Sequence, residues 1–276
     1  MKNMLFLPIF FALFQIAAAS HVVVETPQAA EVAEGGFADL GIAGPGQMVE
    51  IGIASGTGQN SALKQSEEAV WDQLNIDPSS LPTGWAGHNA LIYGSNKTAK
   101  IIISPGAEAG VYALKFTAVD EYQGTPALSF TGTVTVSENV LSVDIVGDPV
   151  RVSANEEATY RIRLRNKSGA ADAFSVTVSG VPEAAKYSQQ AYVPANSEAT
   201  VLVHVNIGEQ KVYEPVFTAT SLSSKRITAS AKTILIVGAN LMQELQAAGR
   251  GMLLFPSAEQ AVIYLLGFIA NAMGGQ

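Results

Sequence analysis

The sequence predicts an all-β chain of two tandem β-sandwiches, with an N-terminal signal peptide and a C-terminal hydrophobic helix. Apolar residues alternate along many short segments that Gly and Pro separate, one set of strand motifs occurs twice, and both ends carry apolar runs. With 16 Lys+Arg against 24 Asp+Glu among 276 residues and no basic cluster, nucleic acid is a poor partner. The lack of Cys excludes disulfides, thiol catalysis and thiolate metal sites.

Residues 1–20 have the layout of a secretory signal peptide. Lys2 precedes the apolar run Met4–Phe14, and the small residues Ala17–Ser20 follow. Cleavage near the end of that run would start the mature chain at about His21. A buried N-terminal helix and an uncleaved anchor are the alternatives. We therefore expect an extracytoplasmic protein of the cell surface.

Two N-glycosylation sequons fit an exported chain. They begin at Asn96 and Asn166, and each tripeptide is a weak signal alone. An exported chain of this size without Cys relies on its core, which is more usual for prokaryotic surface domains than for small eukaryotic secreted ones. Together these features indicate an archaeal or bacterial envelope.

The strand segments come next in chain order, between the two ends. Alternation predicts strands at residues 48–53, 99–103, 111–118, 130–136, 141–146, 159–164, 174–178, 199–205, 212–219 and 227–237. Many short strands with turns between them favour antiparallel sandwiches over βαβ units.

A repeat divides this region into two domains. The motif Val111–Ala118 recurs as Val212–Ala219, 101 positions later. A period of about 100 residues is the size of one immunoglobulin-like domain. We expect Tyr112 and Tyr213 to be structural and to hydrogen-bond the backbone at a strand corner. The expected domains are residues 21–139 and residues 140–238.

Two motifs of the first domain carry a family resemblance. Leu81–Trp85 reads Leu-Pro-Thr-Gly-Trp, and Pro105–Tyr112 reads Pro-x-x-x-Ala-Gly-x-Tyr. On these residues the chain resembles the immunoglobulin-like surface domains of archaeal and bacterial envelope proteins, including the NEW3 domains that accompany glycoside hydrolases. The second domain departs from the pattern, with Lys211 in place of the Gly before Tyr213. Because the motifs are structural, the resemblance implies the fold, with Trp85 in the core.

Alternation stops after residue 238, and residues 239–276 form an amphipathic segment plus a hydrophobic helix. On a helical wheel one narrow face, suited to packing against another helix, holds Gln260, Tyr264, Gly267 and Asn271. The apolar run is short for the ~20 residues of a membrane span. We expect a membrane anchor or membrane-associated helix, and docking of this tail on a partner protein is the alternative.

No pattern in the sequence carries catalytic or metal chemistry. His21, His88 and His204 are isolated from other ligands, and Asp120-Glu121 supplies only two of the several oxygens that Ca²⁺ takes. We therefore expect no enzyme, no cofactor and no metal site.

The first domain has one stretch that the second lacks. Its residues Ser61–Leu74 are expected to form a short helix, and Trp71 within it has two interpretations. It either caps the sandwich or stands exposed on a recognition loop, since loops carry function on such scaffolds.

The expected function is that of a non-enzymatic surface protein with a structural, adhesive or protein–protein interaction role, anchored by its C-terminal helix. Its partners would be envelope proteins or glycans. The alternatives are a carbohydrate-binding or accessory module of a surface glycosidase, which an exposed aromatic pair would favour, and a subunit of a membrane complex. The sequence leaves the oligomeric state open.

Overall fold

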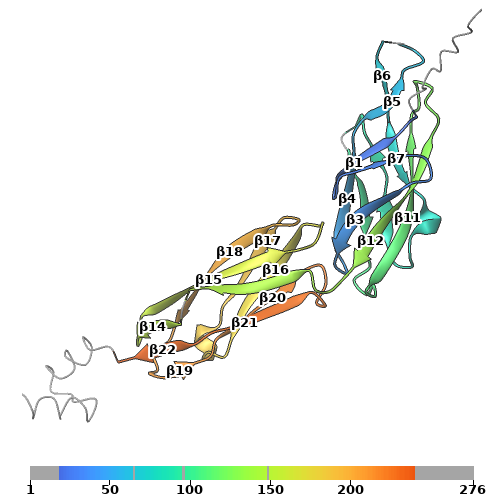
Figure 1. The fold of residues 1–276 in the computed structure, drawn as a ribbon. Helices are drawn as coiled ribbons and strands as arrows, with labels where there is room; N and C mark the ends of the chain where they lie inside the picture. Colours follow the sequence, from blue (N-terminus) through green and yellow to red (C-terminus); the bar gives the residue numbers. More distant parts are fainter. Residues whose placement is uncertain (1–18, 65, 95–96, 148, 240–276) are drawn as a thin grey trace, which may run out of the picture. The chain divides into compact units, whose positions relative to one another are not determined.

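A computed structural model describes residues 19–64, 66–94, 97–147 and 149–239 (Figure 1). The chain divides between Ser137 and Glu138 into two compact units. Outside the described residues lie most of the predicted signal peptide, the sequon residue Asn96 and the C-terminal face of Gln260, Tyr264, Gly267 and Asn271. Within the described ranges, no helix has the length and apolar character to cross a membrane.

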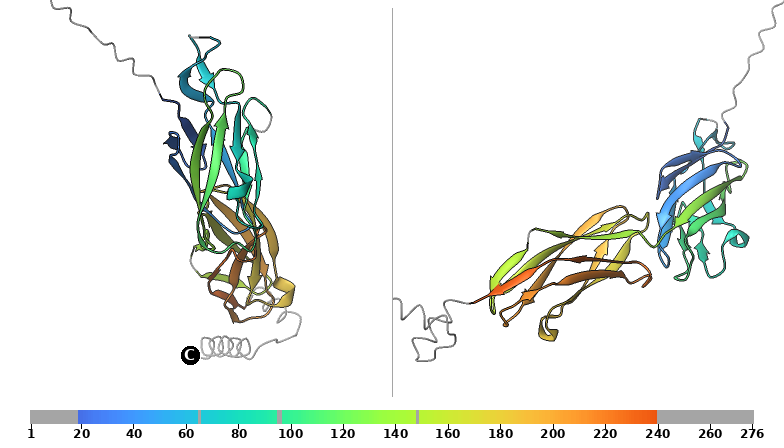
Figure 2. Two further views of the ribbon diagram at one scale, coloured as in Figure 1. Left: turned by 90° about the vertical axis from the view of Figure 1, so that its right-hand side faces the viewer. Right: turned by 60° about the horizontal axis from the view of Figure 1, so that its bottom comes forward.

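Unit 1 packs two five-stranded sheets against each other (Figure 2). The first sheet, in spatial order, is β2 (Ala30–Val32), β1 (Val22–Thr26), β4 (Met48–Ile53), β10 (Ala99–Ile102) and β8 (Ala86–His88). The second is β3 (Phe37–Ala43), β12 (Leu128–Val136), β11 (Gly110–Val119), β7 (Gln73–Ile76) and β9 (Ala90–Leu91). A separate hairpin consists of β5 (Gly56–Asn60) and β6 (Glu68–Val70).

Unit 2 is built in the same way around its own core. One sheet is β13 (Leu141–Val146), β15 (Glu157–Asn166) and β18 (Glu198–Asn206). Facing it are β17 (Ser188–Val193), β16 (Asp172–Ser179), β20 (Val216–Ser221) and β21 (Thr228–Lys232). A short sheet continues this layer with β14 (Val150–Ser153), β22 (Leu235–Gly238) and β19 (Val212–Tyr213).

The two copies of the repeated motif occupy equivalent strands, as predicted. In unit 1, Tyr112 on β11 lies opposite Val134 on β12, and in unit 2 Tyr213 lies opposite Leu235. Unit 2 differs because its strand is split into β19 and β20 around Pro215, which has no backbone N–H to donate to a neighbouring strand.

The topology of each unit is that of an immunoglobulin-like sandwich. An early strand pairs in parallel with the last one, β3 with β12 and β14 with β22. The Tyr112 hydroxyl donates to the Glu108 carbonyl (2.9 Å) and the Tyr213 hydroxyl to the Glu209 carbonyl (3.5 Å), which is the tyrosine corner of this fold. The predicted all-β class and the structural role of both tyrosines are confirmed.

The helix expected over Ser61–Leu74 is wrong, because this stretch contains β6 and the start of β7. Burial alternates along it: Ala69 and Trp71 are buried while Val70 is half-buried, and Leu74 lies opposite Ala118 on β11. Pairing with β11 thus determines the structure of the β7 residues. The prediction of a core Trp85 is only partly right, since this residue is half-buried and its ring packs on Tyr112 at 5.0 Å between centroids.

Candidate recognition surface

Three connecting segments of unit 1 are joined to one another by hydrogen bonds. They are the β5–β6 hairpin, the turn after β9 and the loop between β11 and β12. Ala62 donates its backbone N–H to the Gln123 carbonyl (2.9 Å), and Val70 donates to the Gln123 side chain (3.2 Å). The turn after β9 is joined through Asp72, which lies between β6 and β7: Ile92 donates to the Asp72 carbonyl (2.7 Å), and Glu121 of the β11–β12 loop donates to the Asp72 carboxylate (2.7 Å). The segments therefore form one surface on the sandwich, which we call the loop surface.

Asp120 shapes the β11–β12 loop. Its carboxylate accepts backbone N–H groups from Tyr122 (2.9 Å), Gln123 (2.7 Å) and Thr125 (2.8 Å). Partial burial raises the pKa of Asp120, but these hydrogen bonds outweigh it and leave the pKa below the ordinary value of 3.8. Both carboxylate oxygens of Asp120 therefore hold the conformation of this loop.

Trp71 and Asp72 anchor the same surface from below. Trp71 is 1% exposed, and its indole N–H donates to the His21 carbonyl (3.1 Å). Asp72 is buried and accepts the backbone N–H of Glu121 (2.7 Å). The interpretation of Trp71 as an exposed recognition residue is corrected by this burial, and its ring caps the sandwich instead.

Three other side chains stand exposed on the loop surface. Leu63 is 73%, Tyr93 62% and Tyr122 67% exposed, one from each segment. A hydrogen bond with Glu121 raises the pKa of Tyr122, and the negative charge of Glu121 acts in the same direction. Sequence reasoning missed both tyrosines. The available signal was an aromatic residue followed closely by Gly in a predicted connection, as in Tyr93-Gly94.

The sequon residue Asn166 lies in unit 2 and is 1% exposed. Its side-chain amide donates to the carbonyls of Ala170 (2.8 Å), Pro194 (3.1 Å) and Val193 (3.3 Å). Its oxygen accepts from the Ser168 N–H (3.0 Å) and hydroxyl (2.7 Å). A glycan on this amide would break the set, so the folded unit offers no acceptor at Asn166.

The histidines are distributed over both units. His21 and His88 belong to unit 1, and His204 in unit 2 contacts the Glu157 carboxylate at 2.7 Å. Among the residues that the structure describes, no group of three or more His, Asp or Glu side chains is arranged to hold a metal ion.

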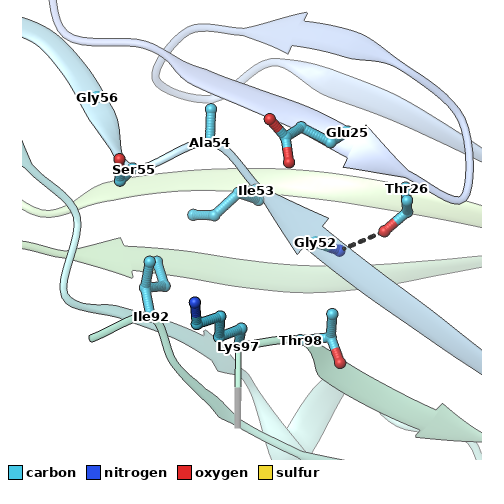
Figure 3. Close-up of a pocket in the computed structure, with 10 residues that line it drawn as sticks. All are labelled: Glu25, Thr26, Gly52, Ile53, Ala54, Ser55, Gly56, Ile92, Lys97 and Thr98. Atoms are coloured by element: carbon cyan, nitrogen blue, oxygen red, sulfur yellow. Dashed lines mark hydrogen bonds between the residues drawn. The ribbon is translucent and has the colours of Figure 1, made fainter. Parts of the chain in front are cut away.

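A hollow of about 540 Å³ lies where β4 leaves its sheet (Figure 3). The Gly-rich stretch Gly52–Gly56 lines it, and the Gly52 N–H donates to the Thr26 hydroxyl (2.9 Å). Its two charged residues, Glu25 and Lys97, come from different segments of the lining (Figure 3). Within this stretch Gly52 and Ile53 end β4, Ala54 and Ser55 form the link, and Gly56 begins β5.

No protein-family model matches the sequence, and no curated protein matches it. Among solved structures, the fibronectin(III)-like modules of Clostridium thermocellum CbhA are 16% identical and cover 80% of this chain and 96% of theirs, with a TM-score of 0.28. The ASH/PapD-like domain 7 of human CEP192 is 11% identical and covers 38% of this chain and 89% of its own, with a TM-score of 0.26. The immunoglobulin-like architecture itself follows from the strand pairing and the tyrosine corners.

Proposed function

We propose that this chain is a non-enzymatic protein of an archaeal or bacterial cell surface, and that the loop surface of unit 1 binds a protein of the same envelope. One observation carries the proposal: Leu63, Tyr93 and Tyr122 are exposed on three segments that hydrogen bonds hold together. Tyrosine supplies a large contact area at low conformational cost, which makes it frequent on recognition loops.

The anchoring below the loop surface supports recognition by a preformed site. The buried carboxylate of Asp72 and the three N–H bonds to Asp120 fix the backbone under Tyr122. A loop that is already ordered loses little entropy on binding, so more of the contact energy appears as affinity. The carboxylates of Asp72 and Asp120 accept these backbone hydrogen bonds, and this structural use fits a binding role better than catalysis.

The two ends of the sequence support the export and anchoring that the proposal includes. The layout of residues 1–20 supports secretion, and the apolar run of residues 261–273 supports a membrane anchor or docking tail. The motif resemblance to NEW3-like envelope domains supports the same location.

A carbohydrate partner is the second candidate. The exposed rings of Tyr93 and Tyr122 on the loop surface favour it, because sugar rings pack against aromatic faces while their hydroxyls meet polar groups.

The test measures binding of the full chain to isolated cell envelopes, with Tyr93→Ser/Tyr122→Ser as the variant. Tyr192→Ser is the matched control, because Tyr192 is 65% exposed in unit 2. Loss of two aromatic contacts should weaken binding at least tenfold, at about 1 kcal/mol or more for each. Unchanged binding of the double variant would refute the loop surface as the site.

Envelope treatment separates the two partners. If protease treatment of the envelopes abolishes binding and periodate oxidation of their glycans does not, the partner is a protein. The reverse result assigns the loop surface to glycans and overturns the first choice.

A further inference from the structure

The outer edge of β18 is unusually open for an edge strand. All nine residues of β18 pair with β15 without a register shift, from Glu157 opposite Asn206 to Arg165 opposite Glu198. Edge strands are normally kept short, bulged, or interrupted by Pro or Lys, because their free N–H and C=O groups attract other strands. The β18 sequence EATVLVHVN contains none of these features.

The other edge strands of the described residues are all shorter than β18. They range from two residues in β9 and β19 to seven in β3, and the pairing of β3 has a register irregularity. Length and regularity therefore single out β18.

Unit 1 shows what can occupy the same edge. Ala99 on β10 lies opposite Ile51 on β4, as Ala199 on β18 lies opposite Leu164 on β15, so β10 and β18 are equivalent. On its outer side, β10 pairs with β8 through Ile102 and Ala86. In unit 2 the corresponding segment is β17, which pairs with β16 instead. The place that β8 fills in unit 1 has no strand among the described residues of unit 2.

The outward direction of the β18 backbone is visible at Leu202. The Tyr187 hydroxyl donates to the Leu202 carbonyl (3.1 Å), so this carbonyl points away from β15. Backbone groups alternate in direction along a strand, so Thr200 and His204 present theirs to the same side. The Tyr187 hydroxyl occupies this carbonyl at the centre of the edge, so pairing with another strand requires a backbone donor to replace it.

We propose that β18 pairs with β18 of a second copy of this chain, antiparallel and centred on Leu202. Two three-stranded sheets would then join into one continuous sheet. The pairing is isologous, since each partner uses the same edge.

The residues of β18 complement themselves in this register. Leu202, 48% exposed, would lie opposite Leu202 of the second copy. Thr200 would lie opposite His204, and Glu198 opposite Asn206, so no like charges would face each other directly. This matters for a chain with a net charge of −8, whose copies repel one another elsewhere. Self-complementarity favours a second copy over an unrelated strand.

A single introduced cysteine tests the register, because the chain has no Cys of its own. Opposite residues of a hydrogen-bonded antiparallel pair lie ~5.5 Å apart at Cα, within the range that a disulfide spans. Full-length Leu202→Cys should form a covalent dimer on mild oxidation. Ile102→Cys is the matched control, because Ile102 is 37% exposed on the equivalent strand, whose edge β8 covers. Equal cross-linking of both variants would overturn the proposal.

A charged residue at position 202, the centre of the proposed pairing, provides an independent test, with self-association measured by sedimentation. Leu202→Lys and Leu202→Glu should each weaken self-association at least tenfold, and an equimolar mixture should restore it as a heterodimer. Circular dichroism checks that both variants remain folded. A monomeric wild-type chain would refute the proposal, and so would a stable partner at this edge other than a second copy.

Discussion

Substitution of Asn166 by Ala tests whether this residue stabilises unit 2 through its buried amide or serves as a glycan acceptor. Five hydrogen bonds are lost, yet not all their partners are orphaned. The Ala170 carbonyl keeps the Ser168 hydroxyl (2.7 Å), and the Pro194 carbonyl keeps the Ser197 hydroxyl (2.9 Å). The Ser168 N–H and the Val193 carbonyl lose their bonds to Asn166.

The expected cost follows mainly from the Ser168 N–H, because Val193 also lies opposite Asp172 in the β16–β17 ladder. A buried polar group without a partner costs about 1–3 kcal/mol, and the other lost bonds of the amide add to it, so Asn166→Ala should destabilise unit 2 by about 3 kcal/mol. For a domain of about 100 residues this lowers Tm by roughly 12–24 °C. Ser168→Ala also removes the sequon. The two acceptors of the Ser168 hydroxyl keep other bonds, however: the Ala170 carbonyl keeps the Asn166 amide, and the Asn166 oxygen keeps the Ser168 N–H. The cost of Ser168→Ala should be about 1 kcal/mol.

The assay separates the units because both Trp residues, Trp71 and Trp85, lie in unit 1. Thermal unfolding followed by circular dichroism reports both units, whereas Trp fluorescence reports unit 1. Asn166→Ala should shift a transition seen by circular dichroism and leave the fluorescence transition in place. If the two substitutions act equally, loss of the sequon is the common cause and the reasoning from the buried amide is refuted.

Two further predictions concern single polar groups. The Tyr160 hydroxyl has no hydrogen-bond partner among the described residues, and burial raises the pKa of Tyr160 to about 12. Tyr160→Phe should therefore leave unit 2 equally or more stable, whereas Tyr213→Phe, which loses the bonds to Glu209, should cost about 1 kcal/mol in chemical denaturation. Equal losses would contradict this contrast. The pKa of Asp120 is lower in the folded state than its ordinary value of 3.8, so its stabilisation is complete above that pH and is lost as pH falls through the folded pKa. The stability difference between wild type and Asp120→Asn, followed by Trp fluorescence, should shrink below pH 3.8, and a difference independent of pH would count against it.

The sequence predicted strands well where one face is buried and turns bound both ends. The ends predicted for Met48–Ile53 and Leu141–Val146 agree with β4 and β13. In Ser61–Leu74, the spacing of Val70, Trp71 and Leu74 fits a helix as well as a strand over so short a run. Long-range pairing of β7 with β11 decided between them, and no local pattern reports that pairing.

The site was harder to predict than the fold for the same reason. Trp71-Asp72 and Glu121-Tyr122 look alike locally, since each places an aromatic residue beside an acid. One ring is buried and the other is exposed, because the chain near His21 covers the first and nothing described covers the second. The sequon at Asn166 suggested an exposed residue, yet the side chain is buried. Its Asn and Ser hydrogen-bond to each other within the turn after β15.

The two units share the sandwich fold but differ in whether one edge strand is covered and in the length of their connections. Unit 1 covers the outer edge of β10 with β8 and extends its connections into the loop surface. Unit 2 leaves the equivalent β18 edge open and has no counterpart of the β5–β6 hairpin among its described residues. Because the proposed contacts lie on different units, neither requires the residues of the other. A pair of chains joined through β18 would carry two loop surfaces, and binding of one would raise the effective concentration of the second at a crowded envelope. Weak contacts by Tyr93 and Tyr122 would then suffice for stable attachment.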